Sequence, residues 1–374
     1  MRVGIVAYWF NRGQGVVARH LRSAFEELGH ETFVLARPTR ASNLRPAFVD
    51  REGVWDQPGV TAASAYQVPW EEYQAWDEAN SPDVVFFDQN YQFEEIARLR
   101  RSGVRTAGRF VWEAFSPHHV GAATEALDAI YSLTRCERER YAGLGIDSPL
   151  IPWGCPPELL DVEPRRDPAR VSLFYPGGFM SRRKPFDLVL RAFSRTEDPR
   201  LRLVFKAQVD RGGRKVRRLA RRDDRIEVVS DDLRTPEYHE LFASCDACLA
   251  PSRWEGLGLH LYEATAFGMP IVTNDNPPMN ELVTDGQNGI LVPGHRAGEA
   301  KSGIPAFEPD VGELAEAIER LTDDELRRRL ASGALELRDR LRWDRTVAAL
   351  GELANSVAGA PAAPVEPEAS RPPL

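Results

Sequence analysis

Residues 250–273 read Ala-Pro-Ser-Arg-Trp-Glu-Gly-Leu-Gly-Leu-His-Leu-Tyr-Glu-Ala-Thr-Ala-Phe-Gly-Met-Pro-Ile-Val-Thr, and their pattern is the clearest indication of fold class in the chain. It begins at the end of a short apolar run, Ala247–Ala250, which is typical of a buried strand. Gly256 and Gly258 predict a loop whose backbone can approach a ligand closely, and a helix is expected to begin near Leu259. A second apolar strand closes the stretch. Strand, loop, helix and strand form the repeating unit of a doubly wound parallel sheet.

The same alternation recurs outward in both directions. In the first half we expect strands at Val3–Ala7, Glu31–Ala36, Asp83–Phe87 and Thr106–Trp112, and helices at Val16–Leu28, Phe93–Arg101, Ala122–Leu133 and Cys136–Leu144. In the second half we expect strands at Val171–Tyr175, Leu201–Ala207, Ile226–Val229, Ala247–Ala250 and Ile271–Thr273, and helices at Lys184–Phe193, Pro236–Cys245 and from Leu259 to near Gly268. The pattern predicts an α/β protein with two Rossmann-like doubly wound domains that face each other across a cleft.

The chain length of 374 residues fits two such domains at roughly 150 residues each. We expect an N-terminal domain at 1–160 and a C-terminal domain at 171–340, joined through the proline-rich, charged segment Pro156–Arg170. Residues 358–374 are rich in Ala, Pro and Glu without periodicity, so a disordered tail is expected there.

Composition excludes several classes of function. The formal net charge of -8 gives no reason to expect a nucleic-acid partner. No apolar run approaches the roughly 20 residues that span a bilayer, and the N-terminus reads as a first strand, so a cytoplasmic location is expected. Cys245 and Cys248 have CxxC spacing, but no second pair completes a zinc site, and a buried strand explains them better.

Two carboxylates in the opening stretch are candidates for ligand binding. Glu255 lies in the predicted loop and Glu263 eight residues later in the predicted helix, so both can point into one cleft. Such carboxylates can accept charge-assisted hydrogen bonds from the hydroxyls of a sugar and a ribose. The residues alone leave open a solvated helix position for Glu263 and a helix-flanking role for Glu255.

Two glycine-containing loops suggest phosphate binding. Gly13-Gln14-Gly15 separates the first strand from the first helix, where free N–H groups favour anions, although a tight turn would need the same glycines. Pro176-Gly177-Gly178 follows a strand, and Arg182-Arg183-Lys184 opens the next helix. Three cations at a helix N-terminus oppose the helix dipole, which favours a bound anion over a solvated basic turn. The chain has no Asp-x-Asp triplet, so we expect no metal and no cofactor, with cations and helix N-termini carrying the charge of any diphosphate.

These motifs together resemble the retaining family 4 glycosyltransferases of the GT-B fold. The resemblance rests on the segments Arg253–Ala264, Gly268–Val272 and Glu281–Pro293, which include the family's pair of glutamates separated by seven residues. It extends to Gly13–Gly15 with Gly29-His-Glu, to the loop from Gly178 to Lys184, and to Trp343-Asp344, and so covers nearly the whole chain.

The resemblance implies roles for individual residues. Glu263 would hold the ribose hydroxyls of a nucleotide, and Glu255 would contact the transferred sugar. Lys184 would neutralise the departing diphosphate, and Gly15 would offer it a backbone N–H. The remaining donor-binding positions implied are Gly178, Arg183, Gly258 and Leu259.

The sequence departs from the family pattern at two places. Phe179 stands where the family usually has an arginine, five residues before the lysine, and Arg183 or Arg182 is the expected substitute. Glu113 falls where the family often carries a histidine in the N-terminal domain; Glu113 is the expected catalytic substitute, with His118 as the alternative.

The implied activity is transfer of a hexosyl group from a nucleoside diphosphate sugar to an acceptor hydroxyl, with retention and without metal. The acceptor would lie against the N-terminal domain, where the aromatic residues Tyr8, Trp9, Tyr91 and Trp112 either stack on it or belong to the core. Its identity stays open between a glycan, a small molecule and a lipid-linked molecule. A final helix at 341–357 is expected to pack back on the first domain.

Three alternatives remain. The fold also serves phosphorylases and epimerases, although no segment argues for a pyridoxal lysine. The departures at Phe179 and Glu113 would also suit a catalytically inactive GT-B protein that binds sugar nucleotides or a partner. The arginine-rich run Arg211–Arg225 could make peripheral membrane contact, but interrupting acidic residues favour a solvated helix.

Overall fold

The computed structural model describes residues 1–40, 47–179, 181–208 and 213–359. It contains two six-stranded parallel sheets, one in each half of the chain. The N-terminal sheet has the order β3-β2-β1-β4-β5-β6, with strands β1 (Arg2–Tyr8), β2 (Glu31–Arg37), β3 (Val60–Ala62), β4 (Val84–Asp88), β5 (Arg105–Arg109) and β6 (Ala129–Ile130).

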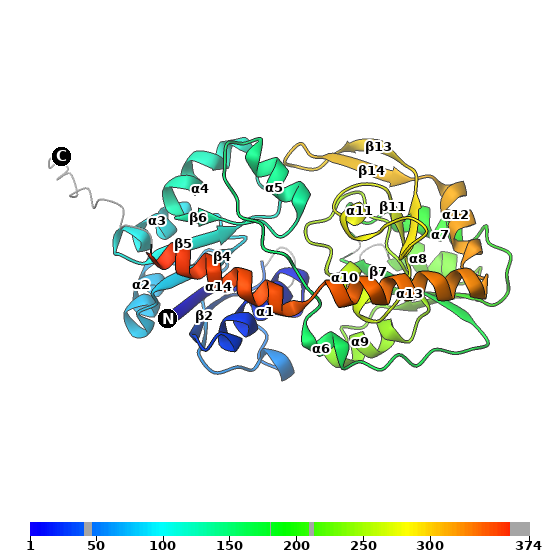
Figure 1. Ribbon diagram of the computed structural model, residues 1–374, viewed down its shortest axis with the longest axis horizontal. Helices are drawn as coiled ribbons and strands as arrows, with labels where there is room; N and C mark the ends of the chain where they lie inside the picture. The colour runs from blue at the N-terminus through cyan, green and yellow to red at the C-terminus, as the bar shows by residue number, and fades with distance from the viewer. Residues whose placement is uncertain (41–46, 180, 209–212, 360–374) are drawn as a thin grey trace.

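The second sheet repeats this topology. Its order is β12-β11-β10-β7-β8-β9, with strands β7 (Val171–Gly178), β8 (Leu201–Ala207), β9 (Ile226–Val229), β10 (Ala247–Leu249), β11 (Ile271–Asn274) and β12 (Gly289–Val292). In each sheet the strand order reverses beside the first strand, and open α/β sheets bind ligands outside the carboxyl ends of the strands at that point. The predicted fold of two facing Rossmann-like domains is therefore confirmed, as Figure 1 shows.

Helices cover both sheets. They are α1 (Gly13–Glu27), α2 (Trp70–Asn80), α3 (Phe93–Arg101), α4 (Val120–Ala126), α5 (Arg135–Ala142), α6 (Pro157–Leu160), α7 (Phe186–Phe193), α8 (Gly213–Ala220), α9 (Thr235–Ala243), α10 (Leu259–Ala266), α11 (Met279–Leu282), α12 (Val311–Arg320), α13 (Asp324–Arg340) and α14 (Trp343–Gly359). A two-stranded antiparallel hairpin, β13 (Gly294–Glu299) with β14 (Pro305–Pro309), follows the second sheet.

The last helix returns to the N-terminal domain and packs against α1, while α13 runs along the C-terminal domain (Figure 1). Leu350 and Ala354 of α14 are fully buried in the core cluster that also holds β1 and α1. The Trp343 indole donates a hydrogen bond to the Glu27 carboxylate at 3.0 Å. The N-terminal domain is therefore completed by residues from the far end of the chain.

Some expected elements were placed wrongly. The predicted helix Ala122–Leu133 is wrong in its second half, because Leu127 adopts an extended backbone and β6 follows immediately. The helix predicted from Lys184 begins at Phe186, which leaves Lys184 in the loop before it.

Two further expectations concern the C-terminal tail and contact with a membrane. The expected tail falls, from residue 360 onward, outside the described residues, as do the first two positions of the arginine-rich run. Among the described helices, none is both long enough and apolar enough to cross a membrane.

Candidate active site

Two adjoining cavities lie between the domains. One, of about 150 Å³, is lined by Trp153, Tyr238, His239 and Glu263 among others, and is named the Glu263 cavity. The other, of about 510 Å³, is lined by Tyr8, Gln89, Tyr91, Arg109 and Glu113 among others, and is named the Glu113 cavity. Residues that line both are Arg12, Gly13, Gly178, Arg183, Gln208, Leu259 and His260. The two cavities therefore form one continuous candidate site.

An ionic cluster around the buried carboxylate of Glu255 stands at the junction of the cavities. Glu255 lies in the loop between β10 and α10 and is only 2% exposed. Its Oε1 atom is 2.6 Å from Lys184 Nζ and accepts a hydrogen bond from the Ser252 hydroxyl at 2.8 Å. Its Oε2 atom accepts a hydrogen bond from Arg183 Nη1 at 2.7 Å. Loops after β7 and β10 thus bring together the cations and the carboxylate that the sequence predicted.

The cluster fixes the protonation of its members. Burial opposes ionisation of Glu255, but the charges of Arg183 and Lys184 outweigh it and hold the Glu255 pKa well below its usual range. Burial lowers the pKa of Lys184, an effect that the negative charge of Glu255 opposes. Burial and the neighbouring Lys184 charge lower the pKa of His260 to about 3, so this imidazole is neutral at pH 7. At pH 7 the junction therefore presents an ionised Glu255 and a neutral His260.

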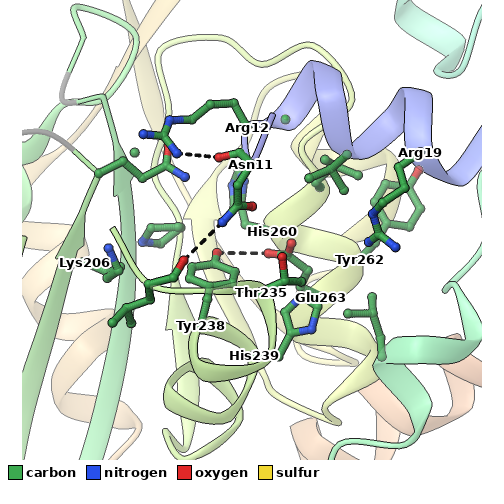
Figure 2. Close-up of a pocket in the computed structure, with 18 of the residues that line it drawn as sticks. Asn11, Arg12, Arg19, Lys206, Thr235, Tyr238, His239, His260, Tyr262 and Glu263 are labelled. Atoms are coloured by element: carbon green, nitrogen blue, oxygen red, sulfur yellow. Dashed lines mark hydrogen bonds between the residues drawn. The ribbon is translucent and has the colours of Figure 1, made fainter. Parts of the chain in front are cut away.

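The second carboxylate has the opposite electrostatics. Glu263 lies in α10, and its Oε2 accepts a hydrogen bond from the Tyr238 hydroxyl of α9 at 3.1 Å (Figure 2). Burial raises the pKa of Glu263 to about 7, because no cation lies close enough to compensate within the described residues. A carboxyl group that is poorly compensated in the protein gains from ligand hydroxyls that donate to it.

The helix that follows Gly258 starts where the sequence predicted it. Gly258 has the left-handed backbone angle φ of +75° and immediately precedes Leu259, the first residue of α10. Gly258 lines the Glu113 cavity, and Leu259 lines both cavities. The positive φ explains the glycine at this position, because side chains strain that conformation.

The loop after β1 contributes Gly13 rather than Gly15 to the cavity walls. A Cβ at Gly15 would lie 2.2 Å from the Phe10 carbonyl oxygen, so close packing of the backbone requires this glycine. The N–H of Gly15 nevertheless belongs to the first turn of α1, where backbone donors have no partner within the helix. The first turn of α1 can still offer N–H groups to an anion.

The loop after β7 resolves which arginine faces the cleft. Gly178 and Arg183 line both cavities, whereas Arg182 lines neither. The ring of Phe179 faces a different cation, since the Arg12 guanidinium carbon stands 5.0 Å from the ring centroid. Arg12 is held across the cleft by Asp232 through contacts of 3.0 and 3.1 Å. Asn11 supports this bridge by donating to the Leu233 carbonyl oxygen at 3.1 Å (Figure 2).

Glu113 lies close to Glu255 on the opposite wall. A Cβ on Gly256 would stand 3.5 Å from Glu113 Oε2, and burial raises the pKa of Glu113 despite the nearby Arg183 charge. His118 and His119 line neither cavity. The His119 ring instead accepts a hydrogen bond from the Ser116 N–H at 3.0 Å and packs on aromatic rings. Of these three residues, Glu113 is the one at the site.

Several residues of the site were missed from the sequence: Arg12, Ser252, Tyr238 and His260. Arg12, Ser252 and His260 each lie in or beside a loop after a strand, so the rule that ligands bind at the carboxyl ends of parallel strands could have marked them. Tyr238 lies inside α9, where its spacing is that of an ordinary core aromatic residue. No cluster of three or more potential metal ligands occurs among the described residues.

The paired sheets, the interdomain cleft and the returning last helix define the GT-B fold. Residues 170–324 match the family model described as glycosyl transferases group 1, which confirms a resemblance to glycosyltransferases over that range. A relative in Streptomyces bingchenggensis, a D-inositol 3-phosphate glycosyltransferase, is 30% identical over 249 residues, covering 63% of this chain and 49% of the relative. The aligned segment thus spans about half the length of that relative.

Solved structures agree over almost the whole chain. Sucrose-phosphate synthase from Thermosynechococcus elongatus superposes with a TM-score of 0.74 at 17% identity, covering 96% of this chain and 99% of that one. HepE from Anabaena, solved in complex with UDP and glucose, gives a TM-score of 0.69 at 14% identity, covering 96% and 100% respectively. At these identities the agreement establishes the fold.

Proposed function

We propose that this protein is a retaining, metal-independent hexosyltransferase of family 4 that uses a nucleoside diphosphate sugar. The observation that carries the proposal is the ionic cluster of the half-exposed Arg183 with the buried Lys184 and Glu255 at the junction of two interdomain cavities. Two cations held at this junction suit a diphosphate leaving group, because preorganised charge usually contributes more than any other effect to stabilising such a step.

The nucleoside of the donor would occupy the Glu263 cavity. Its ribose hydroxyls would donate to the Glu263 carboxylate, which stands beside Tyr238. The diphosphate would reach Lys184, Arg183 and the first turn of α1, whose free N–H groups favour an anion. The transferred sugar would then lie next to Glu255, at the entrance to the Glu113 cavity.

The reaction would exchange one bond to the anomeric carbon for another. The bond between that carbon and the diphosphate oxygen breaks, and its electron pair leaves with the diphosphate. A new bond forms to the acceptor hydroxyl oxygen on the same face of the sugar, and the hydroxyl proton passes to the leaving oxygen. Lys184 and Arg183 neutralise the departing charge, which is why we propose that no metal is required. The surrounding domains would exclude water and so limit hydrolysis.

The comparisons support a sugar nucleotide as donor. The relative in Streptomyces bingchenggensis is named as a glycosyltransferase, and HepE was solved with UDP and glucose. The match to the group 1 family spans residues 170–324, which contain Lys184, Glu255 and Glu263.

A thermal-shift screen of UDP, GDP, ADP and TDP sugars tests this proposal. A ligand at 100 times its dissociation constant stabilises the folded protein by about 2.7 kcal/mol, which raises the melting temperature measurably. We expect sugars of one nucleotide to raise the melting temperature of the wild type but not of Glu263→Ala. Glu240→Ala, at an exposed position, is the control and should respond like the wild type. Transfer in the presence of EDTA should then equal transfer without it.

The outcomes separate the alternatives. No shift with any nucleotide sugar would overturn the proposed donor site. A shift without transfer to any acceptor would favour a catalytically inactive sugar-nucleotide-binding protein. Loss of transfer in EDTA, restored by a divalent ion, would refute the metal-independent mechanism.

A further inference from the structure

Arg12 brings a cation from the N-terminal domain to the junction of the two cavities. It directly precedes α1, and its side chain, which is 6% exposed, lines both cavities (Figure 2). Arg183 and Lys184 also lie at this junction, but they belong to the C-terminal domain and share the carboxylate of Glu255. Arg12 is therefore a third cation at the place where the diphosphate of the donor is proposed to lie.

The carboxylate that holds Arg12 belongs to the opposite domain and is exposed. Arg12 Nη1 and Nη2 donate to the two oxygens of Asp232 at 3.0 and 3.1 Å, and the Asp232 side chain is 54% exposed. An ion pair with an exposed partner contributes little to stability, because water solvates the released carboxylate almost as well. Burial lowers the pKa of Lys206, and the charge of Asp232 opposes this effect, so a second cation lies near Asp232. Arg12 can therefore leave Asp232 at low cost.

The other surroundings of Arg12 also favour an anion. The ring of Phe179 supports the guanidinium, whose carbon stands 5.0 Å from the ring centroid, without using any of its N–H groups. The N-terminus of α1 has no side-chain cap and no acidic residue in its first turn. A cation beside such a helix end is unfavourable on its own, because the helix dipole places positive charge there as well. A bound anion removes this conflict.

The charges at the junction leave a need for one more cation. Arg183 and Lys184 face the single carboxylate of Glu255, so this cluster carries one excess positive charge. A diphosphate that links a nucleoside to a sugar has a negative charge on each phosphate, and the departing nucleoside diphosphate gains another. The cluster alone does not neutralise this group, and Arg12 is the cation from the facing domain that lines both cavities.

We propose that Arg12 exchanges Asp232 for the diphosphate of the donor when the nucleotide binds, so that Asp232 is the counter-ion of Arg12 only while the site is empty. This inference rests on the proposed transfer function and adds a diphosphate-binding residue from the N-terminal domain. Arginine binds phosphate oxygens through paired N–H groups, the same geometry that Arg12 makes with Asp232. The leaving group is then neutralised by side chains of both domains.

Calorimetric titration with UDP, or with the diphosphate of the base that the thermal-shift screen selects, measures this exchange. Saturation-transfer NMR gives the affinity of the matching nucleoside, which lacks the phosphates. We expect Arg12→Ala to bind the diphosphate about tenfold more weakly, the loss typical of a charge-assisted hydrogen bond, and to bind the nucleoside like the wild type. Arg12→Lys should be intermediate, because lysine keeps the charge but not the paired N–H groups. Arg191→Ala, at an exposed position on α7, is the control.

Asp232→Asn distinguishes an exchange of partners from a fixed bridge. Its removal of the competing carboxylate frees Arg12, so UDP should bind about threefold more tightly, which is the effect expected of an exposed ion pair. The same substitution should bring no gain when Arg12 is already alanine. Asp231→Asn is the matched control, because it removes the same charge from a neighbouring exposed residue that lines neither cavity. It should leave the affinity for UDP unchanged.

Unchanged UDP affinity in Arg12→Ala, or an equal loss of UDP and nucleoside affinity, would overturn the inference. Weaker or unchanged UDP binding by Asp232→Asn would also overturn it, and this second test holds even where Arg12→Ala does not fold. Failure of the wild type to bind any nucleotide would instead overturn the proposed function. The two failures are therefore distinguishable.

Discussion

At the scale of single residues, two glutamates eight positions apart are ionised under different conditions. Glu255 is surrounded by Arg183, Lys184 and Ser252, so it stays charged throughout the neutral range. Glu263 has the Tyr238 hydroxyl as a partner, and burial brings its pKa to about 7. Sequence spacing predicted that both carboxylates serve the same cleft but gave no information about this difference, because it depends on side chains from α9 and from the loop after β7.

The raised pKa of Glu263 predicts that this residue destabilises the free protein at high pH. The folded state keeps a proton on Glu263 up to about pH 7, whereas an unfolded glutamate loses it near its ordinary pKa of 4.5. The folded state thus binds more protons between those values, and its stability falls as the pH rises through about 7. Glu263→Gln should therefore be more stable than the wild type at pH 8, by about 3 kcal/mol, and similar at pH 4.5. Denaturation of both proteins at the two pH values measures this. A difference in the free energy of unfolding that is the same at pH 4.5 and pH 8 would contradict the prediction.

Lys184 is predicted to act mainly on the transition state. Its ammonium group is buried beside Glu255, where Arg183 still compensates the carboxylate if Lys184 is removed. Lys184→Ala should lower kcat by about a hundredfold or more, since removing one preorganised charge from such a site typically costs that much. Arg191→Ala, on α7, is a control that should keep wild-type turnover. A variant that changed only KM would indicate a role in ground-state binding instead.

At the scale of elements, helix α5 receives its N-terminal anion from the other domain. The Glu281 carboxylate of α11 accepts hydrogen bonds from the backbone N–H groups of Arg135 and Cys136, at 2.8 and 2.7 Å. Carboxylates at this end of a helix are stabilised by the free N–H groups and the helix dipole. The contact therefore couples the two domains through one helix.

Replacing this carboxylate should weaken the coupling. Glu281→Gln removes the charge but keeps one acceptor oxygen, so we expect a loss of about 1 kcal/mol in the free energy of unfolding. Glu139→Gln, an exposed position in the last turn of α5, is the matched control and should cost nothing. Urea denaturation measures the free energy of unfolding of both variants. An equal effect of the two substitutions would contradict a specific contribution of the contact between Glu281 and α5.

The sequence predicted elements best where a strong pattern had clear ends. The helix at Phe93–Arg101 was predicted with its observed bounds, and α10 begins at Leu259 as expected. Helix α2 (Trp70–Asn80) was missed because its buried residues are only Tyr73 and Trp76, too few for a visible apolar stripe. The β13–β14 hairpin was missed because its first strand is polar and largely exposed, and the Arg253–Glu308 ion pair that joins it to the site loop spans distant residues.

The residues of the candidate site were likewise predicted where the signal was local and missed where it depended on distant residues. Glu255, Gly258 and Lys184 were predicted from motifs within their own loops, and the structure places all three at the cavities. Residues that act across the cleft were not, because nothing local distinguishes Arg12 from any other arginine until its partner Asp232 is placed opposite. Burial without a partner, as at Gln89 and Arg109, is likewise a property of the folded state alone.

At the scale of the whole molecule, the two domains touch closely at one place beside the Glu113 cavity. A Cβ on Gly256, in the C-terminal domain, would lie 2.3 Å from Val111 Cγ1 in the N-terminal domain. Nearby, the Trp112 indole donates to the Glu255 carbonyl oxygen at 2.5 Å. The relative position of the two cavities therefore depends on the absence of a side chain at residue 256.

Gly256→Ala should separate the two halves of the site. A displacement of about 1 Å between reacting groups typically costs about a hundredfold in rate, so turnover should fall by that order, while nucleotide binding to the Glu263 cavity persists. Gly121→Ala, where nothing lies within 4 Å of the new Cβ, is the control. Wild-type turnover by Gly256→Ala would show that the contact between Gly256 and Val111 tolerates a side chain.

The return of α14 to the N-terminal domain also bears on how the chain folds during synthesis. The C-terminal domain is built from a continuous stretch, and its core cluster is complete by Leu330. The first domain still lacks Leu350, Ala354 and Val357 at that moment, so the face of α1 that they cover stays exposed to water. Domains generally fold as units while the ribosome extends the chain. Here the order is reversed, because the N-terminal domain is translated first but its hydrophobic core is completed last.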